Sequence, residues 1–161
     1  MDWSHSLRLS APELLLSFGG LALLLIAAWG GDKSARLINW LAIGLLAVAA
    51  ALVAPTALGG ASGPDTLAFS GLFAANAFAG FAKLLIIAAA GAVLLVSPDF
   101  FDRDGSYRAE YPILVVFAVL GMALMVSATN FLTLYIGLEL NSLAAYVLAA
   151  FRRNDERSAE A

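Results

Sequence analysis

The chain has no cysteine and one histidine, and charged residues make up only 13% of its 161 residues. Without cysteine the chain can form no disulfide, and it has no thiolate ligand for an iron–sulfur cluster or another metal site. A haem or zinc site built on several histidines is not expected, because His5 stands alone near the N-terminus. Nine Lys and Arg against twelve Asp and Glu give a formal net charge of -3, so no basic excess indicates a nucleic-acid partner.

Apolar residues are abundant instead. Hydrophobic residues make up 61% of the chain, and the mean hydropathy is +0.87. Soluble domains are about half apolar and about a quarter charged. Disordered chains have low hydrophobicity. The composition therefore excludes both classes as the default and indicates a membrane protein.

Five apolar runs are long enough to cross a bilayer, which takes about 20 mostly apolar residues per helix. They are too long for barrel strands and apolar on nearly all sides, unlike surface helices. Basic residues follow the first run rather than precede it, which disfavours a signal peptide. We predict an all-α, polytopic helical membrane protein, a single membrane domain over residues 1–161. Its helices are expected at about 12–29, 37–57, 73–96, 112–129 and 131–151.

The positions of Lys and Arg predict the orientation of these spans. Seven of the nine lie after the first, third and fifth runs, Arg8 lies at the other side, and Lys83 lies inside a run. Since basic residues favour the cytoplasmic side, the N-terminus is expected outside. The tail at 152–161 is then cytoplasmic.

Lys83 lies within the third apolar run, between Phe81-Ala82 and Leu84-Leu85. A long lysine near a helix end can extend its ammonium group to the lipid headgroups, and a structural ion pair would also accommodate it. The third alternative is a place in a proton pathway. The residues leave all three alternatives open.

Glu139 is the stronger candidate for a functional group. It lies nine residues after Asn130, or about 13 Å along a helix at 1.5 Å per residue. An acid at that depth is costly and usually marks an ion or proton pathway. Tyr135, Ser142 and Tyr146 share its helix face by spacing. A buried carboxylate that only fixes helix packing by hydrogen bonds is the alternative.

The last two runs carry a family resemblance. The segment 121–153, centred on Gly137-Leu138-Glu139-Leu140-Asn141-Ser142-Leu143, resembles subunit N of bacterial NADH–quinone oxidoreductase, respiratory complex I. The stretch 78–85 resembles the start of that subunit's third helix. The related subunits L and M and the Mrp-type antiporters usually carry Trp or Phe before this glutamate. Gly137-Leu138 therefore favours subunit N.

The resemblance implies an antiporter-like fold of about 14 helices that includes inverted repeats, in which the tail at 152–161 leads toward a sixth helix. It also implies that Glu139 transfers protons opposite a lysine on a later helix, with Tyr135 and Ser142 as supporting polar groups. Such lysines have no counterpart here, which suggests an N-terminal fragment or an incompletely covered subunit. Lys83 is a further candidate for proton transfer.

By this resemblance, the chain contributes to proton translocation coupled to quinone reduction, as a non-redox subunit. No cofactor or metal is expected on it, because NADH, FMN, iron–sulfur clusters and quinone would bind elsewhere in the complex. The expected partners are the other membrane-arm subunits and the lipid bilayer, with no nucleic acid. A bacterial inner membrane is the expected location. The alternatives are an Mrp-type cation/proton antiporter subunit and a structural membrane scaffold.

Overall fold

The computed structural model of the chain describes residues 3–59, 64–102 and 108–150. Within these ranges the chain is almost entirely helical, and one short hairpin interrupts the helices. The hairpin consists of β1 (Leu67–Ala68) and β2 (Phe73–Ala74), paired antiparallel. The helices are α1 (Trp3–Leu9), α2 (Ala11–Gly30), α3 (Ala35–Leu58), α4 (Ala77–Asp102), α5 (Glu110–Ser127) and α6 (Phe131–Ala149).

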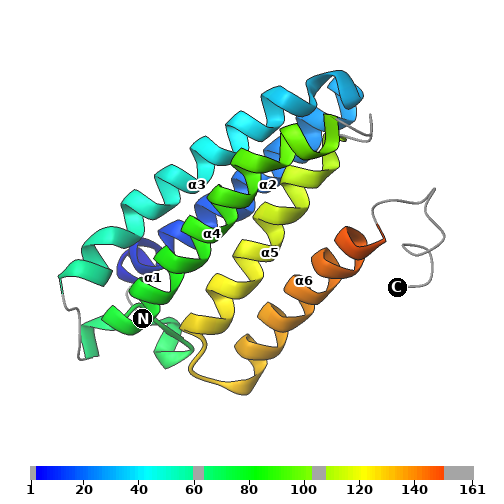
Figure 1. The fold of residues 1–161 in the computed structure, drawn as a ribbon. Coiled ribbons are helices and arrows are strands. Elements are labelled where there is room, and N and C mark those ends of the chain that lie inside the picture. The colour runs from blue at the N-terminus through cyan, green and yellow to red at the C-terminus, as the bar shows by residue number, and fades with distance from the viewer. Residues whose placement is uncertain (1–2, 60–63, 103–107, 151–161) are drawn as a thin grey trace.

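Five of the described helices, α2 to α6, are long and apolar enough to cross a membrane. The prediction of an all-α polytopic membrane protein with five spans is confirmed. The five lie side by side as a bundle of long helices, while the short α1 lies at one end (Figure 1). The described segments thus form one bundle, and the ends of its helices gather at the two opposite ends of that bundle.

The core lies among α2, α3, α4 and α5. Leu16, Ile38, Leu46, Leu94 and Val116 are all fully buried there. One polar contact crosses this core, because the Asn39 side-chain amide donates a 3.0 Å hydrogen bond to the Leu94 carbonyl. These four helices therefore pack around a common core, and α6 lies at its edge.

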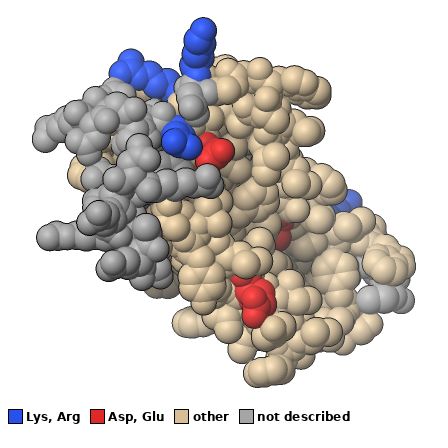
Figure 2. Space-filling model, turned by 90° about the vertical axis from the view of Figure 1, so that its right-hand side faces the viewer, with Lys and Arg blue, Asp and Glu red and all other residues tan. Residues whose placement is uncertain are grey.

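Helix α6 packs mainly on α5 and leaves most of its surface uncovered. Only 11% of its most apolar window is buried, against 50% for α5. Figure 1 shows α6 at one side of the bundle, next to α5. Figure 2 shows the molecule from that side, where most of the described surface is neither acidic nor basic. In a membrane, this uncovered surface of α6 would contact lipid or other protein helices.

The third membrane helix begins later than the sequence predicted. It was expected over 73–96, but Phe73 and Ala74 form β2, and α4 starts at Ala77 and runs past Pro98 to Asp102. The Asn76 side-chain oxygen accepts a 2.8 Å hydrogen bond from the Ala79 N–H, which caps the start of α4. Apolar residues before Asn76 are buried in the hairpin rather than in a helix, and composition alone does not distinguish the two.

Helix α4 also ends six residues later than the expected 96, whereas α2, α3 and α5 begin and end within two residues of the expected positions. Helix α1 was not expected, because its seven residues are too few and too mixed in polarity to form an apolar run. The expected end of the last helix at 151 and the tail at 152–161 lie outside the described residues.

The hairpin brings four segments together at one end of the bundle. Phe73 of β2 forms an isolated bridge with Ala128, which follows α5. The Phe69 N–H donates a 3.2 Å hydrogen bond to the Ser6 hydroxyl of α1. At the same end, the Asn130 side-chain amide donates to the Leu72 carbonyl at 3.3 Å. The starts of α2, α4 and α6 and the end of α5 are thereby held around the hairpin.

Candidate functional site

Glu139 lies near the middle of α6. The helix starts with an Asn130 cap, whose side-chain oxygen accepts a 2.8 Å hydrogen bond from the Thr133 N–H. Glu139 follows Phe131 by eight residues, which places it about 12 Å along the helix axis. The predicted mid-span depth therefore agrees with the position of the residue in α6.

The face of α6 that carries Glu139 points away from the bundle. Gly137 is buried against α5, where it meets Gly121. Glu139 is two residues further on, about 200° around the helix axis. Its side chain is accordingly exposed. The structure thus places this acid on the uncovered side of the last described helix.

The polar stripe predicted around Glu139 is present on α6. Tyr135, one turn earlier, interacts with Glu139 through its side chain. Tyr146 is exposed on the same side of the helix, and Ser142 is half-buried. The role of Tyr135 and Ser142 as supporting polar groups stays a prediction.

No lysine or arginine in the described part of the chain forms a salt bridge with Glu139. An anionic carboxylate in mid-span costs at least a few kcal/mol without a counter-charge. Lys83, the other candidate, belongs to a different ion pair. Among the described residues, Glu139 therefore has no cation paired with it.

Lys83 is buried inside the bundle, with a side chain only 4% exposed. Its Nζ lies 2.5 Å from the Glu13 Oε1, and Glu13 is equally buried. Of the alternatives left open by the sequence, the ion pair is the one observed. A route to the lipid headgroups is excluded by this burial, because α4 turns Lys83 toward α2 rather than toward the surface.

Glu13 is the residue that sequence reasoning missed. It lies two positions after the start of α2, next to Pro12, within a run otherwise read as a membrane span. An acid in such a run is itself a signal, since charged residues in spans are rare and usually paired. Its partner is 70 residues away in sequence, and only the fold shows which of the spans it faces.

A third side chain completes this buried site. The Lys83 Nζ lies 4.8 Å from the centre of the Phe73 ring, within the range of a cation–π interaction. Phe73 lies in β2, four residues before Ala77, where α4 begins. Three elements, α2, α4 and the hairpin, therefore converge on one ion pair.

The comparisons with known proteins agree with the resemblance found in the residues. No family model matches the chain. It is 56% identical over 161 residues to NADH-quinone oxidoreductase subunit N of Erythrobacter litoralis, covering 100% of this chain and 33% of that protein. The same-named protein of Rhizorhabdus wittichii is 53% identical over 163 residues, with the same coverage. That of Sphingopyxis alaskensis is 52% identical over 155 residues, covering 96% of this chain and 31% of the relative.

The chain spans about a third of the length of the curated relatives it matches. Sequence identity above 50% along nearly the whole chain is accompanied here by the five apolar helices of a membrane protein. The resemblance read from the residues around Glu139 is thereby confirmed, and the chain is similar over its full length to the N-terminal portion of NADH-quinone oxidoreductase subunit N.

Proposed function

We propose that this chain is part of a membrane-arm subunit of NADH–quinone oxidoreductase that contributes to proton translocation coupled to quinone reduction. The names of the similar proteins support the complex, and the five apolar helices support a place in its membrane arm. The chain would be a non-redox subunit. NADH, FMN, iron–sulfur clusters and quinone would bind to other parts of the complex.

The position of Glu139 carries the proposal. A carboxylate that faces outward from an apolar helix would meet lipid if α6 were the edge of the finished protein. That arrangement is costly, so further helices are expected to cover this face. Partners for α6 would come from the rest of the subunit or from neighbouring membrane-arm subunits.

The proposed role of Glu139 follows from the same cost. A carboxylate held in an apolar setting binds a proton more readily, and a cation brought near it favours the anion. A lysine on a covering helix would therefore switch Glu139 between protonated and charged states. Tyr135 and Ser142 could donate hydrogen bonds to the charged form. Alternation of this kind is the property that a proton-transfer group requires.

The test is an affinity purification from the source bacterium. The full-length gene product that contains this chain is tagged, extracted in a mild detergent and purified. We expect NADH–quinone reductase activity and the flavin-containing subunits to purify with it. Purification with a set of membrane proteins that oxidise no NADH but exchange Na⁺ for protons would instead indicate an Mrp-type antiporter.

The proposed location is the bacterial inner membrane, with the N-terminus outside. The basis is the distribution of Lys and Arg, because Lys33, Arg36 and Arg108 all lie near one end of the bundle. The hairpin and the starts of α2, α4 and α6 would then face the outside. The Glu13–Lys83 pair belongs to that outer half, since both residues are near the starts of their helices.

A further inference from the structure

The Glu13–Lys83 pair is a buried ionisable site, separate from the exposed Glu139. Lys83 is six residues into α4, about 9 Å along its axis, and Glu13 is in the first turn of α2. Glu139 lies on the far side of α6, turned away from the other helices. Nothing in the proposed role of Glu139 accounts for a charged pair at this place.

The two carboxylate oxygens of Glu13 have different surroundings. Oε1 faces the Lys83 ammonium group at 2.5 Å. Oε2 is fully buried and accepts no hydrogen bond from any residue that the structure describes. A pair with only a structural role would be expected to satisfy both oxygens, because an unpartnered buried oxygen costs free energy. The free Oε2 therefore points to a ligand.

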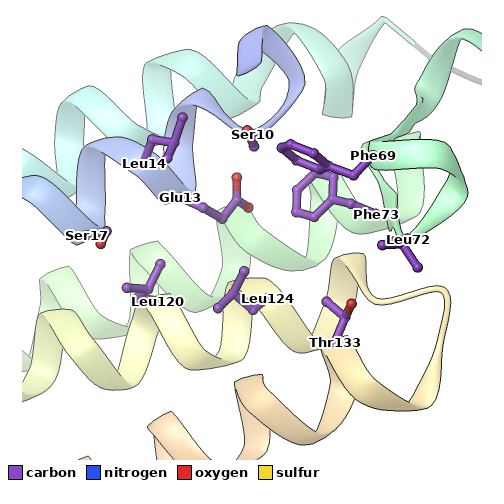
Figure 3. A pocket seen from close by; sticks show the side chains of 10 residues that line it. All are labelled: Ser10, Glu13, Leu14, Ser17, Phe69, Leu72, Phe73, Leu120, Leu124 and Thr133. Atoms are coloured by element: carbon purple, nitrogen blue, oxygen red, sulfur yellow. The ribbon is translucent and has the colours of Figure 1, made fainter. Parts of the chain in front are cut away.

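A pocket lies directly against Glu13. Figure 3 shows the Glu13 carboxylate within it, among side chains from α2, the hairpin, α5 and α6. The cavity has a volume of about 390 Å³, room for several water molecules at about 30 Å³ each. The hydroxyl-bearing residues Ser10, Ser17 and Thr133 line it together with Glu13.

The pocket belongs to one end of the bundle. Glu13 and Thr133 lie in the first turns of α2 and α6, and Leu124 lies in the last turn of α5. Phe73 closes it from the hairpin side. Water that enters the pocket at this end of the bundle would reach Glu13 without crossing the centre of the membrane.

Phe73 gives Lys83 a second source of stabilisation. Its ring face lies 4.8 Å from the ammonium group, on an element other than the one that carries Glu13. If Glu13 became neutral, the ammonium group would keep the Phe73 ring and a neutral hydrogen-bond acceptor. Glu13 can therefore become neutral while the buried Lys83 ammonium group keeps stabilising contacts.

We propose that Glu13 is a second proton-binding site, which takes a proton from water in this pocket while Lys83 stays charged. A hydronium ion gives its proton to Oε2, so that an O–H bond forms there and a water molecule remains. Oε1 stays next to Lys83. The reverse step returns the proton to water at the same end of the bundle.

The charged groups around Glu13 are few. Among the described residues, Lys83 of α4 is the charged group that acts on it. The pocket residues contributed by the hairpin, α5 and α6 are uncharged, namely Phe69, Leu72, Phe73, Leu120, Leu124 and Thr133. Proton binding at Glu13 is thus governed by one cation and by access of water.

Water access is tested first, in the assembled complex that contains the full-length subunit. Thr133 lines the pocket, whereas its neighbour Leu134 is exposed on the outside of α6. We expect Thr133→Cys to react with a small, positively charged methanethiosulfonate reagent at least about tenfold faster than Leu134→Cys. Equal, negligible rates would mean that an acyl chain or a neighbouring helix fills the pocket, and would overturn the proposal.

Proton binding is tested on the unaltered protein with a hydrophobic carbodiimide, which reacts with protonated carboxyl groups. Labelling of Glu13, read by mass spectrometry of its peptide, should rise as the pH falls, by up to about tenfold per pH unit. Lys83→Met should make the labelling strong and nearly independent of pH, because the counter-charge is lost. Labelling that is absent, or equal at all pH values, would show that the pair is only structural.

The two sites can be told apart in the same preparation. The inference about Glu13 does not rest on proton transfer by Glu139, so Glu139→Gln should leave the pH-dependent labelling of Glu13 within about twofold of its unaltered value. Loss of this labelling in Glu139→Gln would contradict the independence of the two sites. A failure of Glu139→Gln to affect pumping would count against the proposed function only.

Discussion

Gly121 of α5 and Gly137 of α6 face each other where these two helices pack together. A Cβ atom added at Gly121 would lie 2.6 Å from the Asn141 nitrogen and 2.8 Å from the Gly137 oxygen, and one added at Gly137 would lie 2.8 Å from the Gly121 oxygen. Small residues allow membrane helices to pack backbone to backbone. This contact fixes the rotation of α6 and so turns Glu139 outward.

The first prediction concerns this contact. Gly121→Ala should push α6 away from α5, because the atoms in the way are backbone atoms that have no room to move. We expect a clear drop in the amount of assembled complex on a native gel. Gly91→Ala is the matched control, since nothing lies within 4 Å of a Cβ atom there. Equal assembly of the two variants would contradict the packing described here.

The second prediction concerns the energetic coupling of Glu13 and Lys83. Lys83→Met leaves the buried Glu13 carboxylate without its counter-charge, a loss of about 3–5 kcal/mol in buried pairs. Glu13→Gln resembles protonated Glu13 and should cost less, because Lys83 keeps the Phe73 ring and a neutral acceptor. We expect each single change to reduce assembly and thermal stability. The double change removes both charges and should recover part of the loss. A double variant that behaves as the sum of the singles would show that the pair is not coupled.

A third prediction concerns orientation. Asp65 lies before the hairpin, and Asp99 lies near the end of α4. The two residues are therefore at opposite ends of the bundle, and both are exposed. In intact cells, Asp65→Cys should react with a membrane-impermeant thiol reagent, and Asp99→Cys should react only after the membrane is opened. The opposite pattern would reverse the orientation inferred from Lys and Arg.

A fourth prediction concerns the start of α6. Asn130 caps the helix through Thr133 and also donates to the Leu72 carbonyl. Asn130→Ala removes both contacts and should cost about 1 kcal/mol or more, visible as a lower thermal midpoint of the purified complex. Asn130→Asp keeps the acceptor for the Thr133 N–H. Its thermal midpoint should lie between those of the alanine variant and the unaltered protein. An alanine variant as stable as the unaltered protein would mean that the cap contributes nothing.

The sequence was sufficient to predict the spans, and the reason is physical. A helix that crosses a membrane must satisfy its backbone internally and present apolar side chains over about 30 Å, so the signal is local and long. The position of Glu139 near mid-span follows from the same run of residues. Its outward rotation does not, because it depends on the glycine contact between α5 and α6.

The Glu13–Lys83 site could not be predicted in the same way. Each residue is visible as an unusual charge in an apolar run, but their pairing depends on how α2 and α4, which both pack on α3 and α5, face each other across the bundle. The hairpin could not be predicted from the sequence for a related reason. Phe73 and Ala74 are as apolar as the helix that follows, and only their pairing with Ala68 and Leu67 of β1 places them in a strand.

The central claim, that Glu139 acts as a titratable group, is tested by the pumping of the assembled, full-length complex. Glu139→Gln keeps the size and much of the hydrogen bonding but cannot ionise, whereas Glu139→Asp keeps the carboxylate. The measurement is the initial rate of NADH-driven proton uptake into inverted membrane vesicles, with assembly checked on a native gel. We predict near-normal assembly in both variants and a larger loss of pumping in Gln than in Asp. Near-normal pumping in Gln, together with failed assembly in Glu139→Ala, would show instead that Glu139 only holds helices together.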